Sequence, residues 1–324
     1  MRHPFQSAVR GALAVIVLAV VCVLLPIAVG VMPARFFAAS CEAGRRIGSS
    51  FFCYGFLWNT LATGVFIGIM GPIIGMFLVH REMALIGETL AHTAFAGVAL
   101  GTVLLGVSGW DVRLLGVAIA VAVGGALAVQ GLADRTGSYG DVPIAIMLTG
   151  SFAVGTLFID LGGGFAFVDI NSYLFGNIAI TDDRSVTLMA VLLLAVVGVV
   201  ALAYRPLLYI TFDDQTATAV QFNVRGYNAL LIVLTALVVV GAMQILGVIL
   251  VAAMLVVPVA AASLVATGFK DALYTATVIG VGSVLSGIGL SWTYRLRPGA
   301  AIVVVAIGAY LIAVLASDRG VLPR

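Results

Sequence analysis

A series of long apolar runs constrains the fold of this chain more than any other feature. A helix crosses the hydrocarbon core of a bilayer with about 20 apolar residues, and here 62% of the residues are hydrophobic while only 9% are charged. The runs do not alternate between apolar and polar positions, which argues against a transmembrane β-barrel. The sequence therefore predicts an all-α, polytopic protein of the cytoplasmic membrane, in contact with the lipid bilayer.

Ten apolar segments are candidates for spans, so we predict about nine to ten transmembrane helices. The segments are residues 11–31, 51–79, 83–107, 112–131, 142–160, 185–204, 227–243, 246–267, 272–290 and 300–316. We expect residues 1–50 to form an additional N-terminal transmembrane helix and an extracytoplasmic loop. A cleaved signal peptide is the alternative for this segment, because Ala-Ala-Ser precedes Cys41.

Short motifs and net charge exclude several classes of function. The chain has one lysine, Lys270, and no glycine-rich loop ending in Gly-Lys-Ser or Gly-Lys-Thr, so it lacks a P-loop for ATP hydrolysis. His-Glu-x-x-His is also absent, which argues against an intramembrane zinc protease. A net charge of +2 is too small to indicate nucleic-acid binding. We therefore predict that the chain is not an enzyme and does not bind nucleic acid.

Two ionisable residues lie inside the predicted span at 83–107. Glu88 and His92 are four positions apart, so a helix places them on one face, one turn from each other. A carboxylate and an imidazole inside a membrane span cost free energy unless a partner, water or an ion meets them. Together they offer one oxygen and one nitrogen ligand to a divalent transition metal. The alternative is a structural Glu–His hydrogen bond between packed helices.

Small residues recur at the spacing of helix–helix contacts. Glycines four positions apart let two helices approach closely inside a membrane. We therefore expect tight packing at three patterns, which are Gly64-x-x-x-Gly68, Gly71-x-x-x-Gly75 and Gly97-x-x-x-Gly101.

Several segments resemble one family of transport proteins. The run Arg81 to His92, Arg-Glu-Met-Ala-Leu-Ile-Gly-Glu-Thr-Leu-Ala-His, and the Ala-Gly-Val-Ala-Leu-Gly that begins at Ala96 resemble the signature of membrane permeases of zinc/manganese/iron ABC transporters. Glu88 stands where that signature has Asp, and its longer carboxylate still ligates metal. Three further segments are similar to parts of the same family: Asn59-x-Leu-Ala-x-Gly, Phe212-Asp-x-x-x-Ala, and the run from Gly247 to Pro258.

The resemblance implies a permease subunit of an ABC transporter that imports manganese, zinc or iron across the cytoplasmic membrane. Residues 51–324 would form the permease domain, with the fold of vitamin-B12/siderophore-type (type II) importers. In that fold two permease copies pair as a homodimer around a central pathway. A separate ATP-binding cassette ATPase would hydrolyse ATP, and an extracytoplasmic metal-binding protein would deliver the ion. The chain would hold no permanent cofactor.

The resemblance also implies roles for individual residues. Glu88 and His92 would contact the metal near the axis of the homodimer. Asn59 is a candidate for the pathway, and a hydrogen bond between packed helices is the alternative for this residue. Residues 212–223 would form a short cytoplasmic helix in the membrane plane that couples the permease to the ATPase. Its coupling residues would be Phe212, Asp213, Asp214 and Ala217, with Phe212 and Ala217 entering a groove on the ATPase. A solvated helix start capped by one of the two aspartates is an additional interpretation.

Two other functions fit the membrane character of the chain. An ion-coupled secondary metal transporter would need no ATPase, and it predicts inverted repeats with matching broken helices, which the sequence does not show. A membrane enzyme with Glu88 and His92 as acid and base would need a third catalytic group, and the sequence offers none. A requirement for ATP separates the ABC permease from both.

Two of the three cysteines, Cys41 and Cys53, lie on the predicted extracytoplasmic side, where disulfides persist. A bridge would tie the additional first helix to the rest of the permease. The spacing does not establish that the two Cα atoms come within disulfide range, so the sequence leaves the bridge open. Cys22 lies inside the first predicted span and is expected to be a small packing residue.

Overall fold

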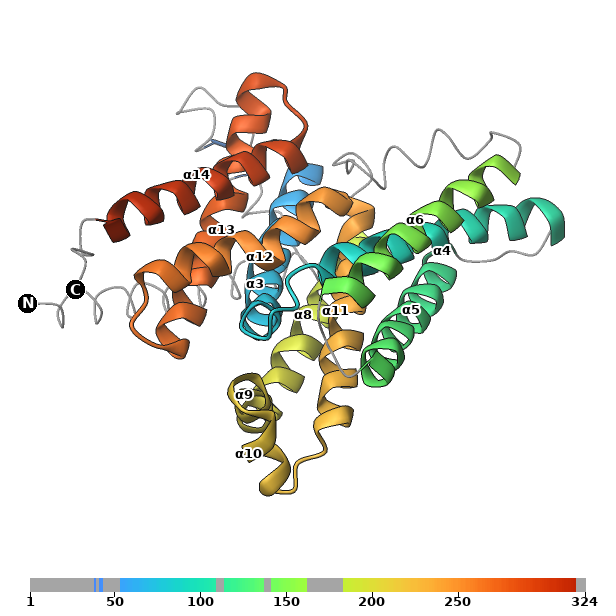
Figure 1. Ribbon diagram of the computed structural model, residues 1–324. Coiled ribbons are helices and arrows are strands. Elements are labelled where there is room, and N and C mark those ends of the chain that lie inside the picture. Colours follow the sequence, from blue (N-terminus) through green and yellow to red (C-terminus); the bar gives the residue numbers. More distant parts are fainter. Residues whose placement is uncertain are drawn as a thin grey trace, which may run out of the picture.

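The structure is a computed structural model of the chain, and it describes residues 38, 41–42, 53–108, 114–136, 141–161 and 183–318. The secondary-structure elements labelled in these ranges are all helices (Figure 1). They are α3 (Gly55–Val79), α4 (Ile86–Ser108), α5 (Leu114–Thr136), α6 (Asp141–Leu161), α8 (Asp183–Leu202), α9 (Tyr204–Phe212), α10 (Asp214–Ala219), α11 (Val224–Leu246), α12 (Val248–Val265), α13 (Phe269–Tyr294) and α14 (Pro298–Asp318). The all-α prediction is confirmed for this part of the chain.

Seven of the described helices are long and apolar enough to cross a membrane: α3, α6, α8, α11, α12, α13 and α14. Helix α4, which carries Glu88 and His92, is outside this set, and the apolar part of α5 is short, at Gly116–Leu132. The predicted number of nine to ten spans is therefore not confirmed. The predicted first span at 11–31 lies outside the described residues.

Helix α3 is the most buried of the seven spans and contacts α8, α11, α12 and α13. Its glycines explain how four helices can surround it. A Cβ added to Gly68 would lie 3.2 Å from backbone atoms of Gly280 in α13, and one added to Gly75 would lie 1.8 Å from the carbonyl oxygen of Leu255 in α12. The backbones are thus in direct contact, which confirms the tight packing predicted from the glycine patterns in α3.

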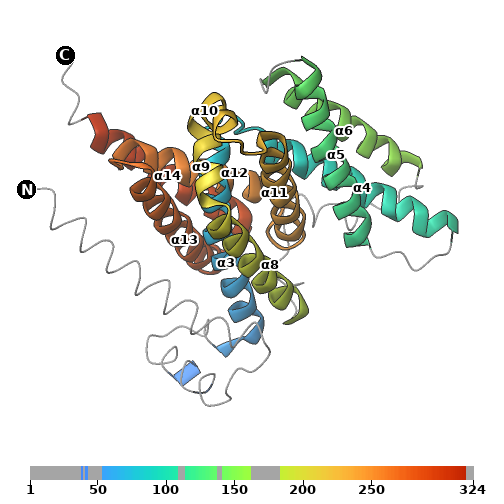
Figure 2. The same ribbon diagram turned by 90° about the horizontal axis from the view of Figure 1, so that it is seen from below.

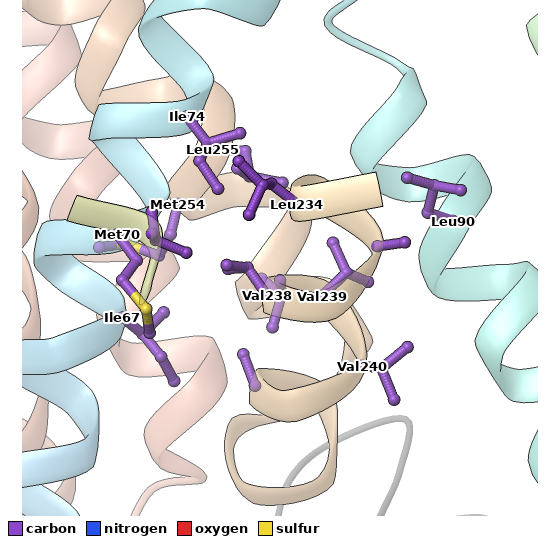
Figure 3. Close-up of a cluster of buried hydrophobic side chains, with 14 of the residues drawn as sticks. Ile67, Met70, Ile74, Leu90, Leu234, Val238, Val239, Val240, Met254 and Leu255 are labelled. Atoms are coloured by element: carbon purple, nitrogen blue, oxygen red, sulfur yellow. The ribbon is translucent and has the colours of Figure 1, made fainter. Parts of the chain in front are cut away.

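The main apolar core lies where α3, α11 and α12 meet. Figure 3 shows side chains from these helices in one cluster, with Ile74 of α3, Leu234 of α11 and Leu255 of α12 directed toward one another. Ile74 and Leu255 are almost fully buried. Burial of large aliphatic side chains of this kind holds the helices in a fixed arrangement, because interiors of proteins are close-packed.

Helices α4, α5 and α6 form a group beside this core. Figure 2 shows the three together, apart from α13 and α14. Helix α4 contacts both α5 and α6, while α5 and α6 contact each other less. The group is attached to the rest of the molecule through α11 and α12, which both contact α4. The helix that carries the candidate metal ligands, α4, therefore contacts both the other two helices of this group and the core.

A disulfide connects the short described part of the N-terminal segment to the start of α3. Cys41 and Cys53 are bonded, with their Cα atoms 4.4 Å apart. The sequence left this bridge open, and the structure contains it. The remainder of the predicted N-terminal addition, residues 1–50 apart from 38 and 41–42, lies outside the described residues, so its helix and loop stay a prediction.

Candidate functional site

A tight turn at residues 80–85 joins α3 to α4 and determines where the candidate metal ligands begin. The N–H of Met83 donates to the carbonyl of Leu78 over 2.9 Å, and Glu82 has a left-handed φ of 59°. These are features of a Schellman motif, which ends a helix and reverses the chain. Glu88 consequently lies in the first turn of α4, where a carboxylate complements the helix dipole.

Contacts with two neighbouring helices fix the first turns of α4. The hydroxyl of Thr89 donates to the backbone carbonyl of Ile144 in α6 over 3.3 Å, and it also bonds within its own helix. Gly87 faces α12 so closely that an added Cβ would lie 2.5 Å from Cδ1 of Leu255. The residues on either side of Glu88 are thus held by α12 and by α6, which leaves Glu88 on the more open face of the helix.

Glu88 and His92 share that open face, as the spacing predicted. The Nε2 atom of His92 lies 4.0 Å from Oε1 of Glu88, and the two side chains are 20% and 46% exposed, respectively. The Nδ1 atom of His92 is buried and has no hydrogen-bond partner among the described residues. Both nitrogens of the ring are therefore free of strong internal hydrogen bonds, and the pair can offer one carboxylate and one imidazole nitrogen to an ion.

An aromatic side chain that the sequence did not indicate borders the pair. The ring of Phe152 in α6 lies 5.1 Å from the His92 ring, edge to face, and it stacks on Phe95 of α4. In the described part of the chain, no group of three or more His, Cys, Asp or Glu residues could hold a metal ion. The site thus has two donors on one side and an apolar wall on the other.

Asn59 lies far from this pair. About 30 Å of helix separates Asn59 from the end of α3 at Val79, just before the turn that leads to Glu88. Its amide Nδ2 donates to Oδ1 of Asp183 over 2.8 Å and joins the first turns of α3 and α8. The structure therefore does not bring Asn59 together with Glu88 and His92, and its place on a transport pathway stays a prediction.

Within the predicted coupling segment, 212–223, the structure has one short helix, α10, which is shorter than predicted, and the preceding helix α9 ends at Phe212. Asp213 separates them with an extended backbone, and its carboxylate accepts hydrogen bonds from the N–H groups of Gln215 and Thr216 and from the Thr216 hydroxyl. Asp213 is therefore the N-cap of α10, and Asp214 is its first residue. These bonds, chiefly that from the Thr216 hydroxyl, hold the pKa of Asp213 below its usual range.

The two apolar residues of this segment differ in exposure. Phe212 is 63% exposed, and its ring lies 6.1 Å from that of His80 in the turn after α3 and 5.7 Å from that of Phe269 in α13. Ala217 is fully buried by its own chain. The expectation that Ala217 enters a groove on a partner is therefore not met in this structure, because its methyl group already packs internally.

The end of α10 holds a residue in a left-handed conformation. Phe222 N–H donates to the carbonyl of Ala217 and Gln221 N–H donates to that of Thr218, which together form a Schellman motif. Gln221 occupies the left-handed position of this motif, with φ 65°. Glycine is the residue best suited to that conformation, so Gln221 carries backbone strain that a glycine would not.

Comparison with known proteins decides the family. The sequence profile of the ABC 3 transport family matches residues 53–317. The chain belongs to the ABC 3 transport family. The manganese transport system membrane protein MntC of Listeria innocua is 32% identical over 267 residues, which cover 82% of this chain and 92% of that protein. The protein of the same name from Halalkalibacterium halodurans is 34% identical over 272 residues, which cover 84% and 91%.

A solved structure supports the same assignment. PsaBC from Streptococcus pneumoniae, in complex with a Fab, aligns with a TM-score of 0.70 and 28% identity over 86% of this chain and 94% of that chain. Together the matches confirm the resemblance to permeases of metal ABC importers, and these relatives are transport proteins rather than enzymes. With seven apolar helices long enough to span among its described residues, the chain is a multi-pass protein of the cell membrane.

Proposed function

We propose that this chain is the permease subunit of an ABC importer that carries a divalent transition metal across the cytoplasmic membrane, with manganese as its first candidate cargo. The observation that carries the proposal is the Glu88–His92 pair on the open face of α4, 4.0 Å apart and partly exposed. Carboxylate oxygen and imidazole nitrogen suit manganese, and also accept zinc and iron. The relatives described above are named for manganese transport, which favours manganese.

A second copy of the chain would complete the metal site. One carboxylate and one imidazole are too few to hold an ion, and two chains around a twofold axis would supply four donors. The open face of α4 supports this arrangement, as does the half-exposed Phe152 beside it, because an apolar ring next to a charged pair suits a protein interface better than lipid. The type II importer fold that the resemblance implies pairs its permeases in this way.

A separate ATPase would dock at α9 and α10. Figure 1 shows these two short helices at one end of the molecule, beyond the ends of α8 and α11. Phe212 supports this role, since it is an exposed aromatic ring that also touches the turn leading to Glu88 through His80. An extracytoplasmic binding protein would deliver the ion to the opposite end of the permease.

Manganese uptake tests the proposal directly. The permease would be reconstituted in liposomes with its ATPase and binding protein, and entry of Mn²⁺ would be followed with and without ATP. We expect wild-type uptake to require ATP and the Glu88→Gln and His92→Ala variants to reduce it to background, because the first replaces the carboxylate by a neutral amide and the second removes the imidazole. Glu82→Gln is the matched control, since it makes the same chemical change at an exposed carboxylate in the adjacent turn.

Two outcomes would contradict the proposal. Uptake that continues without ATP would favour an ion-coupled secondary transporter. ATP-dependent uptake that is unchanged in both Glu88→Gln and His92→Ala would remove the pair from the metal path. Competition by Zn²⁺ or Fe²⁺ against labelled Mn²⁺ in the same vesicles would rank the three cargoes.

A further inference from the structure

A buried amide in α5 makes a hydrogen bond that links two distant parts of the chain. Gln130 is 8% exposed although its helix is otherwise largely apolar, and its Nε2 donates to the backbone carbonyl of Arg225 over 3.0 Å. Most side-chain hydrogen bonds of the buried threonines in this chain stay within one helix, as that of Thr235 does. The bond of Gln130 instead spans 95 residues of sequence and joins α5 to α11.

The acceptor of this bond lies next to the proposed coupling segment. Arg225 is in the first turn of α11, which Asn223 caps by accepting from the N–H of Gly226 over 3.0 Å. The Schellman motif at Gln221 connects this cap directly to the end of α10. No flexible linker therefore separates α10 from the carbonyl that Gln130 holds, so a displacement of α10 moves that carbonyl.

The helix that carries the donor, α5, also contacts α4, the helix of the metal pair. Gly125 lies about one and a half turns before Gln130 in α5, and a Cβ added there would lie 2.4 Å from Cγ2 of Thr93 in α4. Thr93 directly follows His92 in sequence. Helix α5 therefore contacts α11 through Gln130 and α4 through Gly125, which packs against Thr93, the neighbour of His92.

We infer that Gln130 is a positioning residue that transmits movement of the ATPase-contacting segment to the metal-binding helix. This inference rests on the proposed function, since it presupposes an ATPase at α9 and α10. A buried amide in apolar surroundings cannot leave its acceptor without being left unsatisfied, so α5 follows the start of α11 when α10 moves. The number of ions delivered per ATP measures this coupling between the two sites.

The test uses the full complex in liposomes, with Mn²⁺ entry and phosphate release recorded in the same sample. Gln130→Met removes the donor at similar volume, and Gln130→Asn keeps the amide but shortens its reach. In both variants we expect the number of Mn²⁺ ions delivered per ATP to fall at least about fivefold, the lower end of typical coupling between two sites. ATP hydrolysis should stay at the wild-type rate or rise. Thr235→Val is the control, because it removes a buried hydroxyl bonded only within α11.

Each other outcome overturns the inference. An unchanged Mn²⁺-to-ATP ratio in both variants, an equal fall in Thr235→Val, or a parallel loss of uptake and hydrolysis would leave Gln130 with a packing role only. Failure of both variants to accumulate in the membrane would likewise make it a folding residue. Failure of the proposed function itself is visible earlier, since wild-type vesicles would then take up Mn²⁺ without ATP or not at all.

Discussion

Replacing Gly75 by alanine should destabilise the permease more than any other single methyl addition in α3. The added Cβ would lie 1.8 Å from the carbonyl oxygen of Leu255 and 2.8 Å from its carbonyl carbon. Ordinary contact begins near 3.4 Å, so α3 and α12 must separate by about 1.6 Å along this direction. Both groups belong to helix backbones, and neither can rotate away as a side chain would.

The size of the effect follows from two opposing terms. Overpacking a core costs typically about 1–3 kcal/mol, and a backbone-to-backbone clash belongs at the upper end. Alanine gains about 1 kcal/mol over glycine in helix propensity. The net loss is therefore about 2 kcal/mol. It should also reach the site, because the side chain of Leu255 packs against Gly87, the neighbour of Glu88.

Thermal unfolding in detergent, recorded by circular dichroism, measures this loss. Gly198→Ala in α8 is the matched control, since nothing lies within 4 Å of its added Cβ and only the propensity gain applies. We expect Gly75→Ala to melt several degrees below wild type and Gly198→Ala at or slightly above it, with Mn²⁺ uptake reduced only in the former. Equal melting temperatures for the two variants would refute the close backbone contact between α3 and α12.

Three further predictions concern local features. The cap at Asp213 should contribute fully above its unfolded pKa of about 3.9 and be lost as pH falls through its lowered folded pKa. Protection of the α10 amides, measured relative to their intrinsic exchange rates, should therefore fall in acid for wild type and be low at every pH in Asp213→Ala, which has no side-chain acceptor. Gln221→Gly should raise the melting temperature. It removes the strain of a left-handed non-glycine residue, which costs about 1–2 kcal/mol, and it loses about 0.5–1 kcal/mol through the greater chain entropy of glycine. A lower melting temperature would contradict the assigned turn. Maleimide labelling of the denatured chain should find one free thiol before reduction and three after it, and three before reduction would exclude the Cys41–Cys53 bridge.

The sequence predicted the helices better than their arrangement. The predicted spans 51–79 and 185–204 correspond to α3 and α8 within a few residues, because the ends of apolar runs mark the ends of membrane helices. Which helices pack against which could not be predicted. Helices α3 and α12, for example, are apolar on all sides, so no single apolar face identifies the side that contacts a partner helix. Only the glycine patterns indicated where α3 makes backbone contact.

In the coupling segment the sequence indicated a helix start capped by one of two aspartates, and the structure has Asp213 as that cap. Residues 212–223 were predicted as one helix, whereas Asp213 ends α9 and starts α10. Asp213 followed by Thr216 at the third position is a pattern typical of an N-cap, and it competes with helix continuation by binding the next N–H groups. The burial of Ala217 had no local signal, because it depends on how the chain folds back after α10.

At the candidate site, the sequence predicted what lies along one helix and missed what comes from others. Helical spacing alone places Glu88 beside His92, and the structure agrees. Phe152 reaches His92 only because α6 packs on α4, a contact between segments about 60 residues apart that no local pattern encodes. Gln130 carried a weak signal as an amide in an apolar run, but its acceptor is a backbone carbonyl, which any residue type could supply.

The small number of metal ligands suits a transported ion better than a permanently bound one. Structural zinc sites close four ligands around the metal, whereas the described part of this chain presents only Glu88 and His92 together, with Glu88 nearly half exposed. A transport site must bind strongly enough to admit an ion and weakly enough to release it. In the proposed homodimer the donors would be split between two chains, so a movement that separates the two copies of α4 would remove half of the ligands at once. The link through Gln130 would then let ATP-driven movement of α10 alter the spacing of those donors.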